Sequence, residues 1–222
     1  MTAKKTYKPP TMPSLKVRNL FPLTILAILA SGLTAKIKLV KGDDICLVGA
    51  GMGSRMIHYG HFETEIYLNH SDLNLKIRNL CDEGNTPGFR PHPSRNQEEQ
   101  YAFPGAKELI HESLKAGTKP KGHFPTPDQW LSDLHAEVVL CFFGFNSSFD
   151  GPRQADRFKK ELDAYIKHLN SMPFGQSTPQ IALISPTAVE SIPGVTDGRA
   201  QNRNLSIYTQ AMREVALTNK VL

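Results

Sequence analysis

A glycine-rich turn carries the first residues that could do chemistry. The segment from Gly49 to Ser54 reads GAGMGS, follows an apolar run, and leads into a helix predicted to begin near Ser54. The first turn of a helix presents unpaired N–H groups and the positive end of the helix dipole, so an oxyanion or a nucleophile suits this place. Ser54 is the hydroxyl nearest to it, although a serine there more often caps a helix than attacks a substrate.

A second polar group follows another apolar run, at Phe143-Gly144-Phe145-Asn146. Glycine permits close approach of a substrate, and the amide of Asn146 could donate to a developing oxyanion. A Gly-x-Asn sequence is common in ordinary turns. Its position at the end of a predicted central strand favours a place in a site.

The glycine-rich turn also suits a dinucleotide-binding fold, in which glycines cradle a pyrophosphate. That fingerprint requires a third glycine where Ser54 stands. It also requires an acidic residue after the second strand, where this chain has Arg78 and Asn79. We therefore disfavour a nicotinamide-type oxidoreductase and expect no cofactor.

Three further residues could suggest a metal. His58, His61 and Glu63 are close in sequence, but their spacing differs from the His-Glu-x-x-His pattern of zinc helices. We expect a structural or substrate-lining role and no metal. For Trp130 we favour packing over the lining of a sugar site. The aromatic cluster is expected to form core and cleft wall; its members are Phe142, Phe143, Phe145 and Phe149.

Alternating strands and helices must position these residues. Four apolar runs predict buried parallel strands, at Ile45 to Val48, Leu75 to Arg78, Val138 to Phe143 and Ile181 to Ser185. Helical patterns lie after Ser54, over 106–115, after Thr126-Pro127-Asp128, over 154–170 and over 200–218. This alternation predicts an open α/β sheet covered on both faces, with ligands beyond the carboxyl ends of its strands. The Pro-, Gly- and charge-rich segment 82–121 is predicted to be an insertion over that edge.

The chain ends on two apolar residues after its last helix. Val221 and Leu222 would begin a fifth strand, so we expect a domain whose C-terminal strand is missing. The alternative is a native terminus that frays after the helix.

Several segments together resemble one known superfamily. They are Gly42 to Gly49, Arg55-Met56, His58 to Thr64, Arg78 to Leu80, Phe143 to Phe149 and Ser185 to Ala188. Over nearly all of Lys41 to Leu222 the chain resembles the SGNH (GDSL-type) hydrolase domains of exported proteins from planctomycete-type bacteria. The resemblance implies a flavodoxin-like, doubly wound sheet of order 2-1-3-4-5 in a three-layer α/β/α fold. It also implies hydrolysis of ester bonds, such as acyl groups on carbohydrate.

The resemblance assigns roles to particular positions. The family's nucleophilic serine falls on Gly51, which has no hydroxyl, while Gly84 and Asn146 match the glycine and asparagine of the oxyanion hole. The family's Asp-x-x-His would follow the missing strand. Asp197 precedes the last helix and does not represent that block. Ser54 is kept only as a weak candidate nucleophile, because serine needs a positioned base.

The N-terminal segment has the charge order of an export signal. Five basic residues and no acidic one precede an apolar run from Leu20 to Ala35, interrupted by Pro22. We predict a signal peptide over 1–35 and a domain over 36–222; an uncleaved membrane anchor and a buried core helix are the alternatives. Removing this segment leaves 21 basic against 21 acidic residues, which argues against nucleic-acid binding. The three cysteines imply no disulfide framework.

These observations predict an exported, periplasmic or extracellular, SGNH-type hydrolase-like domain that is inactive or degenerate as given. Its expected ligand is a small-molecule or saccharide ester, with further domains possible in a longer protein. The alternative function is a non-catalytic saccharide-binding module of a larger exported protein.

Overall fold

The computed structural model describes residues 36–115, 123–194 and 197–222. The signal peptide expected over 1–35 lies outside the described residues. The strands are β1 (Asp44–Gly49), β2 (Lys76–Asn79), β3 (Ala136–Phe142) and β4 (Gln180–Ile184). The helices are α1 (Gly51–Arg55), α2 (His61–Asn69), α3 (Ala106–Leu109), α4 (Pro127–Asp133), α5 (Ala155–Ser171) and α6 (Gly198–Asn219). No helix in these ranges is long and apolar enough to cross a membrane.

The four strands form one parallel sheet in the order β2-β1-β3-β4. This confirms the predicted α/β class and strand order, and the strand limits differ from the expected ones by no more than two residues. All six residues of β1 are buried, as a central strand with both faces covered requires. The carboxyl ends of β1 and β3 meet where Gly49 pairs with Phe142.

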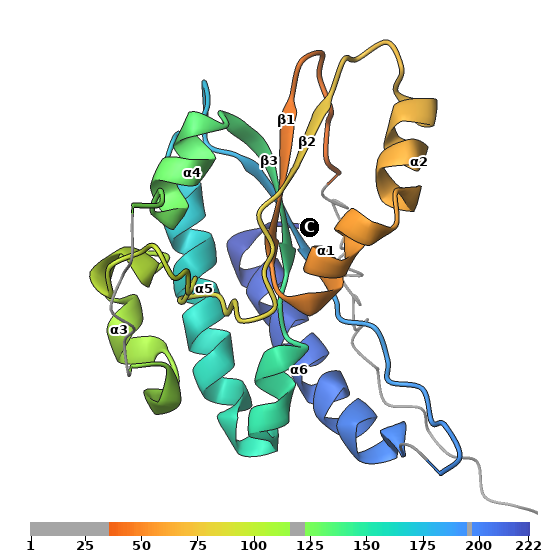
Figure 1. Ribbon diagram of the computed structural model, residues 1–222, viewed down its shortest axis with the longest axis vertical. Helices are drawn as coiled ribbons and strands as arrows, with labels where there is room; N and C mark the ends of the chain where they lie inside the picture. Colours follow the sequence, from red (N-terminus) through yellow and green to blue (C-terminus); the bar gives the residue numbers. More distant parts are fainter. Residues whose placement is uncertain (1–35, 116–122, 195–196) are drawn as a thin grey trace, which may run out of the picture. The chain divides into compact units, whose positions relative to one another are not determined.

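Helices cover both faces of the sheet (Figure 1). On one face α4, α5 and α6 pack on a core that includes Val139, Cys141 and Phe158. On the other face α1 and α2 pack on a smaller core around Leu47 and Phe142. The two cores make the layer order helix, sheet, helix, which is the doubly wound arrangement.

The helix expected over 106–115 is much shorter in the structure. It ends as α3 at Leu109, because Ile110 takes an extended conformation and points its side chain into the core. The His111 ring then accepts a hydrogen bond from the backbone of Ser113 and starts a 3₁₀ turn over Glu112–Leu114. Burial of one isoleucine therefore overrides the local helical pattern.

The buried carboxylate of Glu161 binds the segment after β2 to α5 through hydrogen bonds. Glu161 of α5 is fully buried and accepts hydrogen bonds from Thr86 Oγ1 at 2.6 Å and from Gly88 N at 2.7 Å. Its second oxygen accepts from Arg157 Nη1 at 3.0 Å. A Cβ on Gly88 would lie 3.2 Å from this carboxylate and 3.0 Å from the Ile110 side chain, so glycine at residue 88 favours the close approach of the loop.

Burial should give Glu161 a distinctive effect on the pH dependence of stability. Desolvation raises its pKa above the ordinary value of 4.5, although its hydrogen bonds and Arg157 oppose the shift. The folded state then holds a proton that the unfolded state has lost, so this group's contribution to stability falls as pH rises from about 4.5 through the folded pKa. Denaturant titrations of the natural protein and of Glu161→Gln measure this. The free energy of unfolding of the natural protein, minus that of the variant, should become smaller as the pH rises through this range. A difference that rises with pH would contradict this.

The last residue pairs with the edge of the sheet. Leu222 N donates to Ile181 O at 3.1 Å, and Leu183 N donates to Leu222 O at 2.8 Å. This alternation is that of a parallel ladder, and it lies beside β4, where the fifth strand was expected.

Candidate functional site

The turn after β1 is shaped by a glycine with positive φ and by a short helix. Gly49 has a φ of 136°, and α1 begins at Gly51, three residues before the expected start. The N-cap residue is Ala50, whose side chain makes no capping bond. Ser54 Oγ instead donates to Gly51 O at 3.1 Å, so the interpretation of Ser54 as an N-cap was wrong.

Gly53, the last glycine of the turn, allows close packing of α1. A Cβ on Gly53 would lie 2.3 Å from Cys81 Sγ and 3.1 Å from Phe142, so glycine lets α1 settle onto the sheet. Asn79, at the end of β2, donates from Nδ2 to Gly53 O at 2.8 Å. Asn79 thus occupies the place where a ribose-binding acid would stand, and its amide is engaged with the turn. Close packing thus accounts for the glycine at residue 53.

The segments that carry Gly51, Gly84 and Asn146 adjoin one another. Asn146 opens a 3₁₀ helix (Asn146–Asp150) after β3, and its Nδ2 donates to the carbonyl of Glu83, the residue before Gly84. The Glu83 carboxylate lies 3.5 Å from Arg55 at the end of α1, which is the helix that Gly51 begins. Glu83 therefore links the three segments at the carboxyl edge of the sheet. Since an amide nitrogen carries two hydrogens, one donor of Asn146 remains for a ligand.

The loop after β2 is fixed to the turn after β1. Gly49 O accepts hydrogen bonds from Asp82 N at 2.9 Å and from the buried Asn85 Nδ2 at 3.0 Å. Asn85 lies in an irregular loop, where an asparagine gives no periodic signal in the sequence. Its burial distinguishes it from a solvated loop residue.

Activated nucleophiles are not found among the described side chains near this turn. The hydrogen bond from Ser54 Oγ goes to a backbone carbonyl, and within the described ranges no histidine accepts from this hydroxyl. Burial raises the pKa of the Cys81 thiol to about 12, so this neighbour of the turn is not a thiolate at neutral pH. A His–Asp pair, His168 with Asp128 at 2.9 Å, joins α5 to α4 and makes no bond to Ser54.

The structure also places the flanking residues that the sequence pattern indicated. His58, His61 and Glu63 lie in or near α2, and no group of three potential metal ligands occurs in the part of the chain that the structure describes. The expectation that Phe149 belongs to the core or cleft wall was wrong, because its side chain is exposed and touches Phe145 edge-on.

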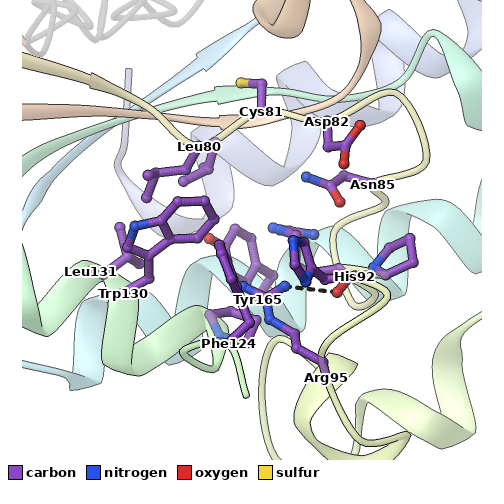
Figure 2. A pocket seen from close by; sticks show the side chains of 14 residues that line it. Leu80, Cys81, Asp82, Asn85, His92, Arg95, Phe124, Trp130, Leu131 and Tyr165 are labelled. Atoms are coloured by element: carbon purple, nitrogen blue, oxygen red, sulfur yellow. Dashed lines mark hydrogen bonds between the residues drawn. The ribbon is translucent and has the colours of Figure 1, made fainter. Parts of the chain in front are cut away.

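A cavity of about 200 Å³ opens beside this edge (Figure 2). Figure 2 shows Leu80, Asp82 and Asn85 above it and Trp130 and Phe124 beside it. The Trp130 and Phe124 rings meet edge to face at 4.9 Å, and α4 holds Trp130 in place through the predicted cap, in which Thr126 and Gln129 bond reciprocally. The cavity lining also includes two arginines, Arg90 and Arg95, that the sequence pattern did not reveal.

No protein family and no curated protein matches this sequence significantly. The solved structures with a similar fold include two enzymes. An α/β hydrolase enzyme from the metagenome of Lake Arreo, Spain, shares 15% identity and a TM-score of 0.50, over 83% of this chain and 77% of that one. A gut microbial diltiazem-metabolizing enzyme shares 12% identity and a TM-score of 0.51, over 83% of this chain but only 36% of that one.

These similarities concern the arrangement of strands and helices. At such identities a shared fold does not transfer an activity or a set of catalytic residues. The assignment to the SGNH superfamily therefore stays a prediction. The described domain has an α/β fold like that of the α/β hydrolase enzyme from Lake Arreo.

Proposed function

We propose that this chain is an SGNH-type, hydrolase-like domain that binds an ester of a small molecule or saccharide and does not cleave it unaided. One observation carries the proposal: the first residue of α1 is Gly51, without a hydroxyl, while Asn146 and the Gly84 loop meet beside α1 through Glu83. This arrangement supports the proposal that Asn146 and the Gly84 loop offer donors to a carbonyl oxygen, at a place where the attacking group of the superfamily is lacking.

In acyl transfer, the groups that bind an ester differ from the groups that hydrolyse it. Oxyanion donors bind and polarise an ester, but hydrolysis also requires a nucleophile with a base that takes its proton. Ser54 donates to a backbone carbonyl and so has its proton directed away from any base. Binding without turnover fits this set of groups. Within the proposal, the domain is exported and serves as the recognition part of a larger protein.

An esterase assay tests this directly. The purified chain should hydrolyse p-nitrophenyl acetate at the rate of the buffer blank, and Ser54→Ala should leave that rate unchanged, because no base activates the hydroxyl. Gly51→Ser restores the hydroxyl of the superfamily, and a Cβ at residue 51 meets no atom within 4 Å, so this variant should fold. It should also remain at the blank rate, because a hydroxyl alone lacks its base.

Activity in the natural chain that disappears in Ser54→Ala would overturn the proposal and make Ser54 the nucleophile. Binding is measured separately, by calorimetric titration with an acetylated oligosaccharide. Asn146→Ala should weaken that binding by about tenfold, because the loss of one hydrogen bond to a buried carbonyl lowers affinity by about this factor. Equal affinity of both proteins would remove Asn146 from the site.

A further inference from the structure

Two buried arginines line the cavity and form no ion pair with a described side chain, although Glu161 acts on Arg90 and Glu99 acts on Arg95 from a greater distance. Arg90 is 5% exposed and Arg95 is 3% exposed, and no ion pair to either occurs within the described ranges. Buried charges in proteins are normally paired, because removing an ion from water without a partner costs several kcal/mol. A bound anion would therefore stabilise the two guanidinium groups.

Backbone carbonyls orient the pair but do not neutralise it. Arg95 Nε donates to Pro125 O at 2.7 Å, and Arg95 Nη1 donates to Arg90 O at 2.8 Å. Arg90 Nη1 makes only a long contact of 3.4 Å to Phe89 O. Arg90 Nη2 is buried and has no hydrogen-bond partner among the described residues. A buried donor that no protein acceptor uses is available to a ligand that enters the cavity.

Aromatic rings hold both guanidinium groups in position. Arg90 lies over Phe143 at 4.8 Å and over Tyr165 at 5.0 Å. Arg95 lies over Phe124 at 5.1 Å and over Trp130 at 5.7 Å. Cation–π contacts of this kind fix the planes of the groups but leave their N–H edges available. The site is thus preorganised, with little rotamer entropy left to lose on binding.

The remaining titratable groups in the lining leave the cavity positive. Burial and the charge of Arg90 lower the pKa of Arg95 to about 10, so Arg95 keeps its charge at neutral pH. Desolvation and Arg95 lower the pKa of His92, which is therefore largely neutral there. Asp82, also in the lining, is an exposed residue and is screened by water.

We propose that this cavity binds a small organic carboxylate, with its oxygens on the Arg90–Arg95 pair and its apolar body against Trp130 and Phe124. The planar, forked guanidinium matches a carboxylate in a bidentate manner. The apolar walls formed by Leu80, Leu131 and the two rings favour an anion with a hydrocarbon or aromatic body over a fully hydrated inorganic one. This inference is independent of the proposed ester binding, because it rests on residues of the cavity and none of the turn after β1.

Trp130 makes the test direct, because it is the only tryptophan of the chain. Titration with benzoate should change its fluorescence saturably. Benzamide, which has the same shape without the charge, should produce no saturable change, and inorganic phosphate should bind at least about tenfold more weakly than benzoate, because charge and apolar contact are both needed. Equal binding of benzamide, equal binding of phosphate, or no response to benzoate would each overturn the proposal.

A variant assigns the effect to the arginine pair. Arg95→Gln should weaken benzoate binding by at least about tenfold, because it removes a charge-assisted hydrogen bond. The matched control is Arg203→Gln on the exposed surface of α6, which should bind benzoate as the natural chain does. Unchanged affinity in folded Arg95→Gln would overturn the proposal.

Circular dichroism shows whether the variant is folded. If Arg95→Gln does not fold, thermal unfolding of the natural protein decides. Benzoate should then raise the melting temperature and benzamide should not. Equal effects of the two compounds would overturn the proposal.

Discussion

Replacement of Gly49 by alanine is expected to destabilise the domain by about 3 kcal/mol or more. Gly49 has a φ of 136°, where residues with a side chain are strained. A Cβ there would also lie 2.2 Å from Phe142 O and 2.6 Å from Phe142 C. These are backbone atoms of the neighbouring strand, so the clash cannot be relieved by a rotamer change. Denaturant unfolding monitored by circular dichroism measures the loss.

Gly51→Ala is the matched control for this substitution. It lies two residues away in the same turn, and its Cβ would meet no atom within 4 Å. Alanine at the start of α1 should leave stability unchanged or raise it by up to about 1 kcal/mol, because it restricts the unfolded chain. If both variants unfolded at the same denaturant concentration, the close approach of β1 and β3 at Gly49 would not be a requirement of the fold.

Replacement of Glu161 by alanine is expected to cost about 3 to 5 kcal/mol. The change leaves Thr86 Oγ1 and Gly88 N without their acceptor in the interior, and it removes one partner of Arg157. The loop that carries the cavity arginines would lose its hydrogen bonds to Glu161 of α5. The measurement is the free energy of unfolding, together with hydrogen exchange at Gly88 and its neighbours, which should lose protection first.

Glu214→Ala provides the comparison for Glu161→Ala. Glu214 pairs with Lys159 between α6 and α5, but both side chains are more than 40% exposed. Removing an exposed pair should hardly move the unfolding midpoint, since water and salt screen it. If both variants lost the same free energy of unfolding, the buried position of Glu161 would not make its interactions stronger than those of an exposed pair.

Much of the fold could be predicted from sequence because the responsible signals are local. The four apolar runs became β1 to β4, and the Thr126-Pro127 start of α4 formed a capping box with Gln129. Parallel strands joined by helices then required a sheet with both faces covered and its loops at one edge. That edge is where Asn146 and the Gly84 loop lie together.

Other features depend on how the elements pack against one another. The helical pattern after Ala106 ends at Leu109 because Ile110 enters the core, and Ser54 bonds to Gly51 O because α1 begins earlier than its sequence suggested. No local signal distinguishes such residues from their neighbours. Their conformation follows from burial, which is a property of the assembled layers.

The sequence by itself determined the order and type of the elements, the covered parallel sheet and the absence of a hydroxyl at Gly51. Only the tertiary structure decided that Arg90 and Arg95 lie buried among four aromatic rings and that Glu161 holds their loop. Periodicity reports which face of an element meets the core, so it identifies strands and helices. An irregular loop has no such period. Whether its charged residues face water or a cavity is set by the elements against which it packs.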